Sequence, residues 1–97
     1  SKLKAFVLAR QMMDELELFL IAVDPKEQSK GLGSILMSEL LAKAVARQIT
    51  RVFLEVSELN KKAIALYKKF GFLKIDTRKN YYKNGENAWV MRLEICN

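Results

Sequence analysis

An apolar stretch that ends at a proline and leads into a glycine pair constrains this sequence more than any other feature. Seven of the eight residues from Leu16 to Val23 are apolar, and Asp24-Pro25 follows directly. Such runs are typical of strands inside a sheet that is covered on both faces. Proline cannot donate to a sheet ladder. We therefore predict a strand buried on both faces that ends at Asp24-Pro25.

The periodicity of the remaining chain predicts six further elements. These are strands over 4–12, 51–56, 72–78 and 88–95, and helices over 31–47 and 60–70. A three-residue hairpin, Met13-Asp14-Glu15, would join the first two strands. The apolar stripe of the first helix would consist of Leu32, Ile35, Leu36, Leu40, Leu41, Ala44 and Val45. The order β-β-α-β-α-β-β predicts one α/β (α+β) domain over residues 1–97, a mixed sheet flanked by helices whose β-α-β parts have parallel strands and right-handed crossovers.

Composition limits the chemistry that the chain can perform. Of its 97 residues, 51% are hydrophobic and 29% are charged, an ordinary globular mix. It has no histidine and one cysteine, Cys96, so Ser-His-Asp, Cys-His and zinc sites are excluded and no metal is expected. The cysteine usage favours a reducing, cytoplasmic location, and no apolar run is long enough to span a membrane. Acid–base chemistry must come from Glu, Asp, Lys or Tyr.

The formal net charge of +6 favours an anionic partner. Nucleic acid, the ribosome and a multiply phosphorylated cofactor all fit, and so does a role in solubility alone. No basic run is longer than two residues, and the aromatic residues are not interleaved with arginine. Direct contact with nucleic acid is therefore not expected.

Two glycines stand between the predicted strand at 16–23 and the helix that follows. The first N–H groups of a helix lack partners and carry partial positive charge, so phosphate binds well there. Gly31 and Gly33 would let the backbone approach phosphate oxygens, and Lys30 and Lys26 would add charge. The same pair also fits ordinary turn chemistry. Neither the dinucleotide fingerprint nor the P-loop pattern is present.

A second pattern occupies the predicted helix at 60–70. Asn60 suits its N-cap, and Gly71 suits a left-handed residue after its last turn. The residues that share one face are Ala63, Leu66, Tyr67 and Phe70. Tyr67 is either a core residue whose hydroxyl finds a partner or a phenol available for proton transfer, and both interpretations stay open.

Taken together, these motifs resemble the GNAT superfamily of N-acetyltransferases, and within it the RimI type that acetylates ribosomal-protein alanine. The matching residues are Ile21-Ala22-Val23-Asp24-Pro25, Gln28-x-x-Gly31-x-Gly33, Leu54-Glu55-Val56, Asn60, Ala63, Leu66-Tyr67, Phe70-Gly71-Phe72 and Asn80-Tyr81-Tyr82. The likeness extends from residue 5 to residue 95. It implies transfer of an acetyl group from acetyl-CoA to the N-terminal α-amine of a protein, a ribosomal protein in the RimI type.

The resemblance also implies where acetyl-CoA would bind. Its pantetheine arm would pair with the backbone of 21–23, its pyrophosphate would lie on the amides of 29–34, and Asn60 would hydrogen-bond the arm. The implied cofactor-binding residues are Ile21, Ala22, Val23, Gln28, Ser29, Lys30, Gly31, Leu32, Gly33, Ser34 and Asn60.

The catalytic pair that the resemblance implies is Glu55 and Tyr67. Glu55 would accept the proton of the incoming amine, and partial burial in the apolar strand 51–56 would suit that role. Tyr67 would protonate the departing thiolate, since a phenol with a pKa of about 10 is close enough to a thiol at about 8.5. Both would then face one thioester, so we expect them on the same side of the sheet. The alternative, that Glu55 is a solvent-facing strand residue without a catalytic role, stays open.

Two further expectations concern the acceptor. Tyr81 and Tyr82 lie in the loop between the last two strands, which in the RimI type borders the peptide groove; a loop closed by packed aromatics is the alternative. The family domain begins with a strand and helices that have no counterpart here. An uncovered sheet face would follow, and with it self-association.

Three functions therefore stay open. The first is acetyl transfer to a protein α-amine, or to the amine of a small molecule. The second is binding of CoA without turnover. The third is a basic module that binds RNA or the ribosome and whose affinity would fall steeply with salt.

Overall fold

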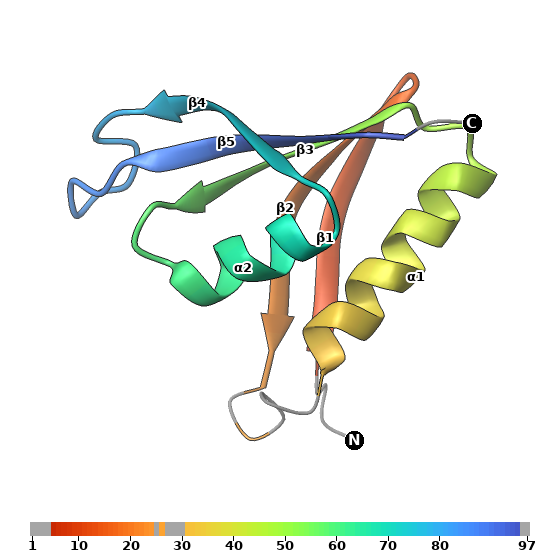
Figure 1. Cartoon of the computed structure of the whole chain (residues 1–97), viewed down its shortest axis with the longest axis horizontal. Coiled ribbons are helices and arrows are strands. Elements are labelled where there is room, and N and C mark those ends of the chain that lie inside the picture. The colour runs from red at the N-terminus through yellow and green to blue at the C-terminus, as the bar shows by residue number, and fades with distance from the viewer. Residues whose placement is uncertain (1–4, 25, 27–30, 96–97) are drawn as a thin grey trace.

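The structure, a computed structural model, describes residues 5–24, 26 and 31–95. Its elements are β1 (Ala5–Met12), β2 (Glu15–Val23), α1 (Leu32–Ala46), β3 (Arg51–Ser57), α2 (Lys61–Lys69), β4 (Leu73–Arg78) and β5 (Ala88–Glu94) (Figure 1). This is the predicted order, and the prediction of a mixed α/β fold is confirmed. Within the described part, no helix is long and apolar enough to cross a membrane.

The strands form one sheet in the order β1-β2-β3-β5-β4. β2 and β3 pair in parallel, and all other neighbours pair antiparallel. β4 therefore runs parallel to β3, with β5 inserted between them. Each helix connects two parallel strands, as the β-α-β pattern predicts.

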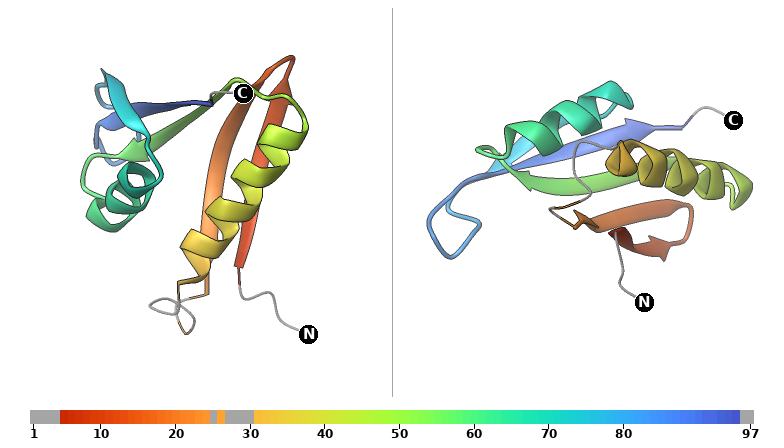
Figure 2. Two further views of the ribbon diagram at one scale, coloured as in Figure 1. Left: turned by 45° about the vertical axis from the view of Figure 1, so that its right-hand side comes forward. Right: turned by 90° about the horizontal axis from the view of Figure 1, so that it is seen from below.

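Both helices lie against the same face of the sheet (Figures 1 and 2). That face carries the core, whose completely buried side chains include Met37, Ile49, Val52, Phe72 and Met91. Among the described residues, no helix covers the opposite face, which we call the open face. It carries Phe6 and Leu8 of β1 and Leu20 of β2, which are 43%, 54% and 44% exposed. The prediction that β2 is covered on both faces is therefore wrong.

Two local predictions also need correction. The first hairpin has a two-residue turn, because Met12 pairs with Glu15 and Met13 takes a left-handed φ of 56°. In α1, the buried residues are Ala44, which belongs to the predicted stripe, and Met37, which does not, whereas Ile35 and Val45 of the stripe are half exposed. The predicted stripe is therefore correct at Ala44 and wrong at Ile35 and Val45.

Two irregularities in strand pairing decide which residues face the open face. In β2, Leu18 pairs with Ala9 and Leu20 with Leu8, so one extra residue is inserted and Ile21 turns toward the helices. In β4, Lys74 pairs with Met91 and Asp76 with Val90. A single extra residue reverses the alternation of every side chain that follows it.

Candidate functional site

The site is built around the point where β2 and β3 separate. Their parallel pairing runs from Glu15 with Arg51 to Leu18 with Leu54 and stops there. Beyond it, β2 continues to Val23 beside β1, and β3 continues to Ser57 beside β5. The sheet therefore divides into two diverging halves, and each of its faces has a pocket next to the division.

The pocket on the helix side is a cleft of about 570 Å³ between the end of β2 and the N-terminal ends of both helices. It is lined by Ile21, Val23, Gly31, Leu32, Gly33, Ser34, Asn60, Lys62, Ala63, Leu66 and Tyr67. Seven of the predicted cofactor-binding residues are among them. Of the other four, Ala22 alternates with Ile21 and Val23 on β2, and Gln28, Ser29 and Lys30 lie outside the described residues.

At Gly31, no side chain covers the backbone that forms the floor of this cleft. Gly31 caps α1 with a left-handed φ of 76°, and an added Cβ would meet no atom within 4 Å. Ser34 Oγ accepts a hydrogen bond of 3.1 Å from Lys69 Nζ, so α2 supplies a cation close to the first turn of α1. Open backbone N–H groups, partial positive charge and an ammonium group are the chemistry that phosphate binds.

Asn60 begins α2 as predicted. Its Oδ1 accepts a hydrogen bond of 3.2 Å from the Ala63 N–H. Gly71, with φ 98°, follows the helix in the left-handed conformation that was also predicted. The side-chain oxygen of Asn60 is therefore used by the cap. Its amide N–H₂ group remains available to donate a hydrogen bond in the cleft.

Tyr67 lies at the inner end of the cleft and is only 8% exposed. Its ring packs edge-on against Phe72 with 5.8 Å between centroids. Burial, and to a lesser degree the charge of nearby Tyr82, raises the pKa of the Tyr67 phenol above its ordinary value of 10.0. Tyr67 is thus both a core residue and a protonated phenol at the cleft.

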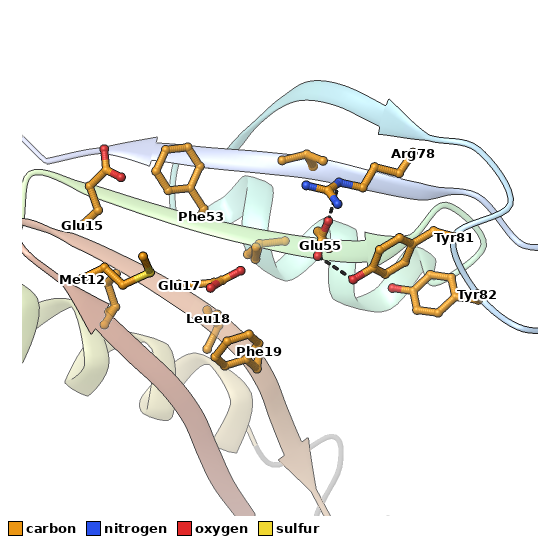
Figure 3. A pocket seen from close by; sticks show the side chains of 13 residues that line it. Met12, Glu15, Glu17, Leu18, Phe19, Phe53, Glu55, Arg78, Tyr81 and Tyr82 are labelled. Carbon is orange, nitrogen blue, oxygen red and sulfur yellow. Dashed lines mark hydrogen bonds and ion pairs between the residues drawn. The ribbon is translucent and has the colours of Figure 1, made fainter.

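The second pocket, of about 450 Å³, lies on the open face and is shown in Figure 3. Its walls are apolar side chains of β1, β2, β3 and β5 together with three glutamates. The lining residues are Met12, Glu15, Leu16, Glu17, Leu18, Phe19, Phe53, Leu54, Glu55, Arg78, Tyr81, Tyr82 and Val90.

Glu55 lies in this pocket with 23% of its side chain exposed. Its Oε1 accepts a hydrogen bond of 2.9 Å from the Tyr81 hydroxyl, and its Oε2 lies 2.7 Å from Arg78 Nε. The contact between Arg78 and Oε2 is an ion pair but not a well-aligned hydrogen bond. Among the described residues, no donor makes an aligned hydrogen bond to this buried oxygen. Partial burial agrees with the expectation, and Glu55 is more than a solvent-facing strand residue.

The loop after β4 carries both predicted tyrosines to the pocket. Their rings pack edge to face, 5.0 Å apart. A tight turn at Gly85, which has φ 86°, closes the loop. The Tyr82 N–H donates to the carbonyl of Glu86, and the Gly85 N–H donates to the carbonyl of Tyr82. Burial, followed by the charges of Glu55 and Glu86, raises the pKa of Tyr82. The packed aromatic loop is therefore present, and both tyrosines also line the pocket, whereas contact with a peptide stays a prediction.

The expectation that Glu55 and Tyr67 lie on the same side of the sheet is wrong. Glu55 alternates with the buried residues Leu54 and Val56 and points to the open face, whereas Tyr67 belongs to α2, which lies against the other face. Both pockets lie next to the division between β2 and β3. Tyr82 lies near it, since its charge acts on Tyr67 and it responds to the charge of Glu55.

Sequence reasoning missed Arg78 and Lys69. Arg78 is the last residue of β4 and reaches Glu55 across the sheet. Lys69 ends α2 and reaches Ser34, 35 positions earlier. Neither belongs to a motif, and only the charge of each was visible in the sequence.

Comparison with known proteins assigns the chain to a family. The model of the acetyltransferase (GNAT) family matches residues 1–72. Over 98 aligned residues, the chain is 39% identical to the [ribosomal protein bS18]-alanine N-acetyltransferase of Salmonella typhimurium and 40% identical to that of Escherichia coli. Each alignment covers 98% of this chain and 66% of the relative, so the chain spans slightly less than two thirds of their length.

Solved structures agree with this assignment. The crystal structure of the ribosomal-protein-S18-alanine N-acetyltransferase from Escherichia coli superimposes with a TM-score of 0.91 at 40% identity, over 97% of this chain and 63% of that one. Ard1 from Thermoplasma volcanium gives the same TM-score at 32% identity, over 96% and 64%. The family match covers most of the chain, and the fold agrees along its length. This chain belongs to the acetyltransferase (GNAT) family.

Proposed function

We propose that this protein transfers an acetyl group from acetyl-CoA to the N-terminal α-amine of a protein, and that the acceptor is a ribosomal protein. One observation carries the proposal. A cleft suited to a phosphorylated cofactor and a pocket with a partly buried glutamate lie on opposite faces of one sheet, next to the division between β2 and β3. A thioester held in this division would be reached from both faces.

The cofactor would lie along the helix-side cleft. Its pyrophosphate would occupy the N-terminal end of α1, where Gly31 leaves the backbone open and Lys69 adds positive charge. Gln28, Ser29 and Lys30 complete the proposed phosphate loop. The pantetheine arm would pair with Ile21, Ala22 and Val23 beyond the last β2–β3 pair, with the amide of Asn60 beside it.

Proton transfer would then run across the sheet. On the open face, Glu55 accepts a proton from the acceptor ammonium directly or through water, and the free amine attacks the thioester carbonyl. When the C–S bond breaks, Tyr67 would donate its phenolic proton to the leaving sulfur, and the second proton that the nitrogen loses as it becomes the amide would return to the phenolate through water. The raised pKa of Tyr67 keeps the phenolic proton in place at neutral pH.

The acceptor would enter from the open face. Tyr81 and Tyr82 border the pocket there, and Phe19 and Phe53 supply apolar walls for a small N-terminal side chain. The relatives named above act on an alanine of a ribosomal protein, which favours the same class of acceptor here. A cytoplasmic site of action belongs to this proposal, since ribosomal proteins are made there.

The direct test measures thiol release from acetyl-CoA in the presence of a peptide that begins with alanine. We expect turnover with the free amine and none with the same peptide blocked at its N-terminus. Turnover with a polyamine but not with the peptide would show that the acceptor is a small-molecule amine instead of a protein. Calorimetric binding of CoA without turnover on any amine would support the second candidate, a CoA-binding unit.

Self-association through the open face is a separate part of the proposal. Phe6, Leu8 and Leu20 expose apolar surface on adjacent strands. Exposed apolar patches commonly mark interaction sites. Sedimentation should show a concentration-dependent dimer that Leu8→Glu weakens, and a monomer at every concentration would exclude it.

A further inference from the structure

The placement of Arg78 depends on the bulge in β4. Arg78 pairs with Ala88, and Asp76 pairs with Val90, the partner of Glu55 on β3. Asp76, Arg78 and Glu55 therefore share the open face. Without the extra residue between Lys74 and Asp76, the alternation would place Arg78 on the helix side. Bulges that re-aim a side chain are frequent next to active sites.

The re-aimed side chain reaches across a whole strand. β5 separates β4 from β3, and its residue beside Glu55 is the apolar Val90, which offers no competing charge. Arg78 Nε lies 2.7 Å from Oε2 of Glu55, and its guanidinium also lies 5.7 Å from the centre of the Tyr81 ring. Tyr81 donates to the other oxygen, Oε1. The two carboxylate oxygens are thus held from one segment, the end of β4 and the loop that follows (Figure 3).

We propose that Arg78 is a positioning residue that fixes the orientation of the Glu55 carboxylate toward the acceptor amine. The inference rests on the proposed function, in which Glu55 is the base. Arg78 itself touches neither the amine nor the thioester in this proposal and acts only through Glu55.

Stability alone gives little reason for this arrangement. The Arg78 side chain is 59% exposed, and exposed ion pairs contribute little to folding. A carboxylate that could rotate freely would, in contrast, lose the alignment that proton transfer requires. Arginine suits this task because its permanent positive charge attracts the carboxylate oxygen over the whole working pH range.

The test compares kinetics of R78Q, R78K and a matched control, R92Q. Arg92 lies on β5 and forms its ion pair with Glu94, away from the pocket. We expect R78Q to lower kcat about tenfold near neutral pH with KM for acetyl-CoA unchanged, R78K to recover part of that loss, and R92Q to behave as wild type. In the E55Q background, R78Q should cause no further loss, because Arg78 acts through Glu55.

Two outcomes would overturn the proposal: an R78Q variant as active as R92Q, or the same tenfold loss in the E55Q background. A second measurement separates this failure from failure of the proposed function. The Nε–H resonance of Arg78, assigned with R78K, should shift in E55Q and stay in E94Q. If the wild type shows no turnover but this shift occurs, the acetyltransferase proposal fails while the pairing stands. If no shift occurs, Arg78 does not position Glu55.

Discussion

Glu55 and Tyr67 lie on opposite faces of one sheet, Glu55 in the open-face pocket and Tyr67 in the cleft beneath α2. They are next to the point where β2 and β3 stop pairing. In this arrangement the acceptor and the cofactor need not share one pocket. Each group can be tested separately, because a variant on one face should leave binding on the other face intact.

Replacing Glu55 by glutamine should affect turnover and spare the cofactor. The amide keeps the size of the side chain but cannot accept the proton of an ammonium, and loss of a general base costs about 10²–10⁴-fold. We expect at least a hundredfold lower kcat at neutral pH, while the calorimetric affinity for CoA stays within about twofold. An equal loss in both quantities would contradict the role of base.

Replacing Tyr67 by phenylalanine should lower kcat and also change the dependence of stability on pH. The pKa of Tyr67 is raised in the folded state because ionising a buried phenol costs solvation. The folded state therefore favours the protonated form, and this contribution to stability is present below the unfolded value of about 10 and is lost as the pH rises through the raised value. Wild type should lose melting temperature between pH 9 and pH 11 more steeply than Y67F. Parallel curves would show that Tyr67 ionises equally easily in both states.

Gly31→Asp and Gly31→Asn form a matched pair for the phosphate site. Both substitutions place a side chain in open space at a left-handed φ of 76°, a conformation that Asp and Asn tolerate better than most residues. The carboxylate would repel a phosphate and the amide would not. CoA affinity should fall at least about tenfold further in the Asp variant, and the difference should shrink at high salt. Equal affinity in the two variants would exclude this turn as the phosphate site.

Asn60 combines a structural and a proposed binding role, and two substitutions separate them. Loss of an N-cap costs about 1 kcal/mol, and serine keeps the cap. N60A should therefore lower the free energy of unfolding by about this amount, and N60S should leave it nearly unchanged. If the amide also contacts the cofactor arm, N60S should still bind CoA more weakly. Wild-type affinity in N60S would leave Asn60 with the cap alone.

Local features of this protein could be predicted from its sequence because they depend on neighbouring residues. The cap at Asn60, the left-handed glycine at 71 and the order of the elements follow from such interactions. The glycine loop and Tyr67 were identified from the same local patterns. In the structure, Tyr67 and the described part of the loop line one cleft. Roles for these residues stay proposals.

Which side chains lie on which face of the sheet was decided by tertiary structure alone. A bulge depends on how a strand meets its partner, and one extra residue reverses the direction of all side chains after it. The bulge in β4 places Arg78 over Glu55, and no period in the sequence shows this. The opposite placement of Glu55 and Tyr67 likewise depends on which face of the sheet α2 covers, and the β2–β3 pairing that ends beside them joins segments more than thirty positions apart.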